Sequence, residues 1–379
     1  MTLKTRPYAN NSFPLRLSIE PREQIPPWLP AATSFGAVVV ALIIGAIILA
    51  LAGGNPLAAY AQIARSSFGG IAVFSDTLVK ATPLILVGLA CTVAFRMRLW
   101  NIGAEGQFFM GAWGASAVVL LPMISAQTSP WVAIPLMMAA AMAAGALWGF
   151  IPGILKAGYN VNEIISTLML NYIAFAWLDF FIFGVWSEGG FQQSATFPKN
   201  AWLPRLTDYA RQVHGLSGLT LHLGLLFALI ATVVVWLILN RSLWGYEIRL
   251  IGDNPRAAQY AGINISRNII LVMMLSGGLA GLAGMSEISG VVHRLQAAIS
   301  PGYGFSGIII AWLAKLNPII VVPVAILFGG LILAGREIQP AGVPRLIQGI
   351  ILFMLIASEV LLRYQVRLVR VAALEAGQA

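Results

Sequence analysis

The sequence predicts an all-α membrane protein of many spans, and two observations lead to this fold class. Hydrophobic residues make up 59% of the 379 residues and charged residues only 10%, whereas a soluble domain carries roughly a quarter charged residues. Most of the apolar residues lie in runs of about 20, the length of a helix that crosses a hydrocarbon core of roughly 30 Å. We therefore expect a polytopic helical bundle.

The apolar runs predict about ten transmembrane helices. Their approximate ranges are 33–53, 72–95, 104–122, 131–153, 163–184, 219–240, 268–289, 304–316, 317–334 and 346–364. The number of full crossings within 304–334 stays open, because the run at 304–316 is short and Lys315-Leu316-Asn317-Pro318 separates it from the next. The transmembrane domain is expected to cover 31–365, between an N-terminal tail at 1–30 and a C-terminal tail at 366–379.

The distribution of basic residues predicts the orientation. Fifteen of the 23 Lys and Arg residues lie on the side that holds both tails and the loop 241–267, and seven lie on the other side. Basic residues accumulate in cytoplasmic loops, so we expect both termini and the loop 241–267 to be cytoplasmic, and the loop 185–218 to be extracytoplasmic. The net charge of +9 then reflects topology, and no patch mixes basic and aromatic residues as a nucleic-acid site would.

The polar loop 241–267 contains a short helix with both ends marked. Asn254 or Asp253 can cap its first turn, and Pro255 suits the first helical position because its missing N–H would be unpaired there. Gly262 can end the helix in a left-handed conformation. A short, well-defined helix on the basic side of a membrane protein is a suitable contact for another protein.

The predicted topology also favours two related halves. Spans two to five begin outside, whereas spans seven to ten begin inside, so the two groups are possible inverted repeats. Each group has a glycine-rich break after its first helix, at 101–107 and at 301–307. Broken helices at matching places in inverted halves are typical of a substrate path.

Several polar or aromatic residues within or beside the apolar runs are candidates for that path. A charged group in the membrane costs about 2.5–3.5 kcal/mol on insertion scales and usually faces a cavity or a partner. The polar break before the third span allows two interpretations, a bent helix start that lines the path or a packing corner whose polar groups satisfy one another. The candidates are Asn101, Glu105, Gln107, Asn171, Glu287, Tyr303 and Phe305. Asp76 and Lys80, four residues apart, are expected to form a structural ion pair on one helix face.

Other classes of site are excluded by the residues present. The only cysteine, Cys91, cannot form an internal disulfide, and the three histidines have no metal-ligand spacing. The chain has no GxxxxGK[ST] phosphate loop and no GxSxG or HExxH motif. We therefore expect neither an enzyme nor a metal site, and no bound cofactor.

Four segments together resemble the permease subunits of ABC importers of the ribose, nucleoside and branched-chain amino acid type. They are LWNIGAEGQFFMGAW at 99–113, VNEIISTLMLNYIA at 161–174, IRLIGDNPRAAQYAGI at 248–263 and SPGYGFSGIIIAWLAKLNP at 300–318. The similarity runs from about 75 to 365. The segments at 101–107 and 162–171 look closest to the simple-sugar and nucleoside branch.

This resemblance implies a transport machine of several chains in the inner or plasma membrane of a prokaryote. A second permease subunit, identical or paralogous, would complete the pathway, two cytoplasmic ATPase subunits would hydrolyse ATP, and an extracytoplasmic binding protein would deliver substrate. The resemblance assigns the contact with the ATPase to Gly252, Asp253, Asn254, Pro255, Arg256, Ala257, Tyr260 and Gly262. The expected substrate is a nucleoside or a simple sugar. The alternatives are a branched-chain amino acid permease of the same kind and an ion- or proton-coupled secondary transporter.

Overall fold

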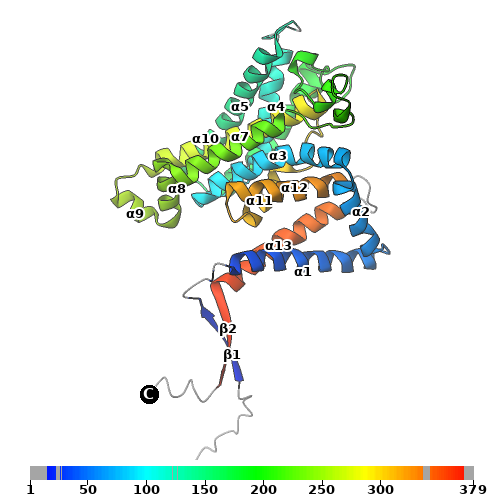
Figure 1. Cartoon of the computed structure of the whole chain (residues 1–379). Helices are drawn as coiled ribbons and strands as arrows, with labels where there is room; N and C mark the ends of the chain where they lie inside the picture. The colour runs from blue at the N-terminus through cyan, green and yellow to red at the C-terminus, as the bar shows by residue number, and fades with distance from the viewer. Residues whose placement is uncertain are drawn as a thin grey trace, which may run out of the picture. The chain divides into compact units, whose positions relative to one another are not determined.

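The computed structural model describes residues 15–22, 26, 28–121, 123–125, 127–335 and 342–370. The chain divides into two compact units, one made of residues 46–348 and the other of residues 1–45 with 349–379. Figure 1 shows the helices of the larger unit, which carries the candidate sites.

Each of the ten predicted apolar runs is helical. These helices are α1 (Leu29–Leu51), α3 (Ile71–Arg96), α4 (Ala104–Leu120), α5 (Pro130–Tyr159), α6 (Glu163–Phe180), α7 (Gly224–Arg241), α10 (Ile265–Glu287), α11 (Tyr303–Leu313), α12 (Pro318–Ala334) and α13 (Val343–Arg363). Three further helices are α2 (Pro56–Phe68), α8 (Leu243–Asp253) and α9 (Pro255–Tyr260). Of these three only α9 was predicted, because α2 and α8 are too short and too polar to form apolar runs.

The structure does not confirm ten full crossings. Among the described residues, six helices are long and apolar enough to cross a membrane, namely α1, α3, α5, α6, α7 and α10, with α6 and α10 each lengthened by an adjoining turn. In contrast, α11 has 11 residues, which at a rise of about 1.5 Å per residue covers only about half of the hydrocarbon core. The break predicted at 315–318 is present, since Lys315 and Leu316 both have positive φ and Asn317 caps α12.

The larger unit is built around α3 and α10, which are mostly buried. Helices α3 and α10 are the first helices of the two predicted groups, and each packs against the next two helices of the other group. Helix α10 packs against α4 and α5, and α3 packs against α11 and α12. Glycines permit the closest of these approaches: a Cβ on Gly111 of α4 would lie 2.1 Å from the Cα of Gly281 on α10. The reciprocal pattern is the one that inverted halves would produce.

Helices α4 and α11 begin within the two predicted glycine-rich breaks, and these two helix starts meet. The backbone N–H of Gly304 donates a hydrogen bond to the carboxylate of Glu105. A Cβ on Gly304 would lie 2.2 Å from the backbone nitrogen of Glu105, so no side chain fits there. The first turns of α11 lie beside the middle of α3, where Val87 contacts Gly307.

Short turns surround the ends of these helices. Phe181–Val185 and Ile288–Val292 extend α6 and α10 as π-helical turns, and 3₁₀ turns form at Lys199–Ala201, Leu206–Tyr209 and His214–Leu216. The segment between α6 and α7 lies at one end of α7, and α8 and α9 lie at the other (Figure 1). The two loops that were predicted to face opposite sides of the membrane are therefore at opposite ends of this helix.

The smaller unit contains a two-stranded sheet that the all-α expectation omitted. Strand β1 (Leu15–Pro21) pairs antiparallel with β2 (Tyr364–Arg370), with Leu15 opposite Arg370. The pairing joins the two predicted tails, so local sequence patterns could not show it. The remaining parts of the tails, 1–14 and 371–379, lie outside the described residues.

Candidate functional site

The polar break before α4 forms a closed hydrogen-bond network. The Asn101 amide donates to Gln107 Oε1 at 2.8 Å and to Ser276 Oγ at 2.9 Å, and its Oδ1 accepts from the N–H of Gly103 at 3.0 Å. The Ser276 hydroxyl in turn donates to the carbonyl oxygen of Ala90. Asn101, Gln107 and Ser276 are all buried, so this network holds the start of α4 against α10 and α3.

Two further candidate residues extend this network, which we call the polar corner. Asn171 of α6 accepts from the N–H of Gly106 at 2.8 Å and donates to the carbonyl of Ile102 at 3.0 Å. Glu105 accepts from the N–H of Gly304 at the start of α11. The polar corner consists of Asn101, Glu105, Gln107, Asn171 and Ser276. Its hydrogen bonds match the packing-corner interpretation.

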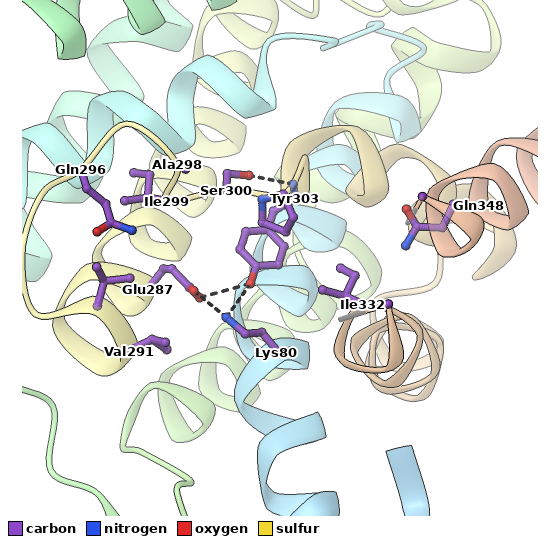
Figure 2. Close-up of a pocket in the computed structure, with 14 residues that line it drawn as sticks. Lys80, Glu287, Val291, Gln296, Ala298, Ile299, Ser300, Tyr303, Ile332 and Gln348 are labelled. Carbon is purple, nitrogen blue, oxygen red and sulfur yellow. Dashed lines mark hydrogen bonds and ion pairs between the residues drawn. The ribbon is translucent and has the colours of Figure 1, made fainter. Parts of the chain in front are cut away.

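A separate pocket of about 600 Å³ lies beside the end of α10. Of the predicted pathway residues, its wall contains Glu287 and Tyr303, whereas no member of the polar corner is among the described residues that line it. Phe305 is 42% exposed and is also outside the wall. Lys80, Gln296, Ser300 and Gln348 supply most of the other polar groups (Figure 2).

A buried ion pair forms part of the pocket wall. Lys80 Nζ lies 2.7 Å from Glu287 Oε1 and donates to the Tyr303 hydroxyl at 3.2 Å. The Tyr303 hydroxyl donates to Glu287 Oε2 at a longer 3.4 Å. Figure 2 shows these three side chains converging from α3, α10 and α11. Lys80 and Glu287 are 6% and 3% exposed, so both charges are withdrawn from solvent.

The ion pair corrects the prediction for Lys80. Asp76 was expected to neutralise it, but the Asp76 carboxylate accepts a hydrogen bond from Thr220, and Lys80 pairs with Glu287. The spacing of four residues permits a contact along one helix, whereas the packing of α3 against α10 offers Lys80 a buried partner. A lysine inside an apolar run was the sequence signal for this site, and the partner on another helix could not be read from it.

Local backbone structure fixes Tyr303 at the pocket. The hydroxyl of Ser300 accepts hydrogen bonds from the N–H groups of Gly302 and Tyr303 at 3.0 and 2.9 Å. Gly302 has φ of 101°, in the left-handed region that glycine tolerates. This turn starts α11 with the phenol ring directed into the bundle, where Tyr303 is fully buried.

The predicted helix in the loop 241–267 is present, with the expected ends. Asn254, not Asp253, is the N-cap of α9, and its Oδ1 accepts from the N–H of Ala257 at 3.1 Å. Pro255 occupies the first position, and Gly262 follows the helix with φ of 76°. The N–H of Ile263 bonds to the carbonyl of Ala258, which completes a Schellman ending.

The predicted ATPase-contact residues divide into an anchored part and an exposed part. Gly252 is buried, and a Cβ there would lie 2.5 Å from the carbonyl oxygen of Arg96, so α8 is packed against the end of α3. Tyr260 is 94% exposed. The other exposed members are Asp253, Asn254, Pro255, Arg256 and Gly262, and Ala257 is half-buried. The loop thus presents a short rigid surface at one end of the bundle.

Comparisons with known proteins identify the class of the chain. The family described as "Branched-chain amino acid transport system / permease component" matches residues 73–358. The guanosine ABC transporter permease protein NupP of Bacillus subtilis is 38% identical, over 86% of this chain and 93% of its own length. The glucose ABC transporter permease protein TsgB13 of Haloferax volcanii is 35% identical, over 93% and 94%. The nucleoside ABC transporter permease protein NupB of Lactococcus lactis is 32% identical, over 90% and 94%.

Proposed function

We propose that this chain, which belongs to the family of permease components named above, forms the translocation path for a nucleoside or a simple sugar in an ABC importer. The observation that carries the substrate class is its similarity, over nearly its whole length, to permeases named for guanosine, glucose and nucleosides. The polar but electrically balanced pocket at Lys80 and Glu287 supports a ligand without net charge.

The proposed machine contains further chains. A second permease subunit, identical or paralogous, would complete the path, and an extracytoplasmic binding protein would deliver the substrate. This chain would bind no cofactor and catalyse no reaction, since the ATP would be hydrolysed by cytoplasmic ATPase subunits. The exposed face of α9, with Asn254, Pro255, Arg256 and Tyr260, is suited to contact an ATPase, because it is rigidly joined through α8 to α3.

The proposed topology places α8, α9 and both termini in the cytoplasm of a prokaryote. The transmembrane domain would cover 31–365, with the cytoplasmic loop at 241–267 and an extracytoplasmic loop at 185–218. The reciprocal packing of α3 and α10 supports inverted halves. Alternating access would then follow when a push on α9 tilts the attached helices and rocks one half against the other.

A branched-chain amino acid is the second candidate substrate, because the family description names that class. Its ammonium and carboxylate could each meet one member of the Lys80–Glu287 pair. Screening the cognate binding protein against nucleosides, pentoses, hexoses and branched-chain amino acids separates the two classes. We expect binding of a nucleoside or sugar, and binding of amino acids alone would contradict the proposal.

Transport by the reconstituted importer tests the coupling mechanism. Replacing Asn254, Pro255 and Arg256 together by glycine should abolish uptake and ATPase association, while the chain still inserts into the membrane. The matched control replaces the exposed residues Arg211, Gln212 and Val213 by glycine at the other end of α7, and it should still co-purify with the ATPase. Uptake by the chain alone that collapses with the ion gradient would instead establish a secondary transporter.

A further inference from the structure

We propose that the Lys80–Glu287 ion pair is a ligand-binding site that recognises two neighbouring hydroxyl groups of the transported molecule. This inference rests on the proposed function, because ribonucleosides and simple sugars both carry such vicinal hydroxyls. It assigns recognition within the membrane to the part of the ligand that the two substrate classes share.

The first argument is the placement of the charges. A buried ion pair contributes little net stability, because removing two charges from water costs about as much as their attraction returns. Charged groups within a membrane protein usually face a cavity or a pathway. Lys80 and Glu287 do so, since both are buried residues that line the pocket (Figure 2).

The second argument is the bonding capacity that remains in the pocket. Lys80 has three N–H donors, and its described partners, Glu287 and the Tyr303 hydroxyl, take two of them. Among the described residues, Glu287 Oε2 accepts one hydrogen bond, the longer one of 3.4 Å from the Tyr303 hydroxyl. The Lys80 ammonium therefore has an N–H donor available beside an acceptor on the Glu287 carboxylate. The two groups are in contact, since Lys80 Nζ lies 2.7 Å from Glu287 Oε1.

This arrangement suits a vicinal diol. One hydroxyl can donate to the Glu287 carboxylate while its neighbour accepts from the Lys80 ammonium, so that each charged group gains a charge-assisted hydrogen bond. The pair has no net charge, and a neutral ligand leaves this balance unchanged. A phosphorylated ligand would bring at least one uncompensated negative charge into the buried pocket, which disfavours it.

The size and walls of the pocket agree with this ligand class. Its volume of about 600 Å³ lies within the range of about 300–1,000 Å³ usual for small-molecule sites. Val291, Ile299 and Ile332 form apolar walls against which the faces of a sugar ring or a base can pack. The pocket lies at the end of α10 remote from α9, so under the proposed topology a ligand arriving from outside meets it first.

The test compares ligands with and without the diol in the complete importer. Two probe pairs are used, and the half-saturating concentration for uptake is measured for each member. One pair is guanosine with 2′,3′-dideoxyguanosine, and the other is methyl glucoside with its 3-deoxy analogue, whose remaining hydroxyls are not on neighbouring carbons. The principal variant replaces both Lys80 and Glu287 by methionine, which leaves no lone buried charge. The binding protein is the same throughout, so a change in the ratio between paired ligands reports on the permease.

The wild-type chain should favour the diol ligand of the transported class, and the double variant should reduce this preference by about tenfold or more, as expected for lost hydrogen bonds to charged groups. Tyr303→Phe keeps the ion pair and should reduce the preference less. The matched control replaces Lys156 and Glu163, an ion pair 3.0 Å apart outside the pocket, by methionine and should leave the ratio unchanged.

Two outcomes would overturn the proposal in distinguishable ways. Equal loss of uptake for both members of a pair would show that the ion pair only holds α3 and α10 together, while the proposed function would stand. Uptake of neither guanosine nor methyl glucoside by the wild-type importer, together with uptake of a branched-chain amino acid, would reject the proposed substrate class and the diol site with it.

Discussion

The polar corner and the pocket are two buried polar clusters that share helix α10, and they differ in how completely their groups are satisfied. At the polar corner, Ser276 and Asn101 belong to a network of amides, a hydroxyl and the Glu105 carboxyl group, whose members bond to one another and to the backbone. At the pocket, Glu287 and Lys80 form an ion pair and border a cavity. Buried polar groups in this protein therefore have two arrangements: the first stabilises helix packing, and the second borders the pocket that we propose as a ligand site.

The largest effect should follow from leaving one charge of the pocket without its partner. Lys80→Met leaves Glu287 buried and unpaired, which destabilises a folded protein by about 3 kcal/mol or more. Replacing both residues by methionine removes this penalty and should restore most of the stability. Thermal unfolding of the purified chain in detergent measures both variants. Equal stability of the single and double variants would mean that solvent reaches the pair.

The next effect concerns the polar corner. Asn101→Ala removes the partner of Gln107, Ser276 and the N–H of Gly103, and unsatisfied buried groups of this kind cost about 2 kcal/mol. The melting temperature should fall, while the preference for diol ligands among the chains that fold should stay as in the wild type. A changed preference with an unchanged melting temperature would place Asn101 in the ligand path. The polar corner would then be a ligand contact and not a structural network.

The smallest expected effect is a pH dependence of stability that comes from two buried histidines at the end of the bundle that holds the pocket. Burial, together with the nearby Arg205 guanidinium, lowers the pKa of His222 from the ordinary 6.5 to about 3 and that of His293 to about 4. The His293 ring also stacks on Trp202, with centroids 3.7 Å apart. Both rings thus stay uncharged in the folded protein at mildly acidic pH.

Because the unfolded chain binds protons below about pH 6.5 and the folded chain does not, stability should fall as the pH decreases from 7 toward 4. Between pH 7 and pH 6 the loss should be about 1 kcal/mol for the two histidines together. Hydrogen exchange of residues 199–223 measures this loss. Replacing His222 and His293 by glutamine should remove the pH dependence, and its persistence would assign it to other groups.

Features decided by neighbouring residues were predictable from the sequence. The cap at Asn254, the proline at position 255 and the left-handed Gly262 are all present, because each acts within one helical turn. The apolar runs are likewise helical, although several helix ends differ from the expected ranges and ten full crossings are not confirmed. The partner of Lys80 was predicted wrongly, because a contact between α3 and α10 joins residues 207 positions apart.

The sequence by itself determined that the chain is a helical membrane protein, where its apolar helices lie and which loop carries a capped helix. Composition and short-range hydrogen bonding govern these features, and both are written in consecutive residues. Only the tertiary structure decided which buried polar groups close on one another and which border a cavity. That distinction depends on how helices distant in the sequence pack, and the same residue types serve both purposes.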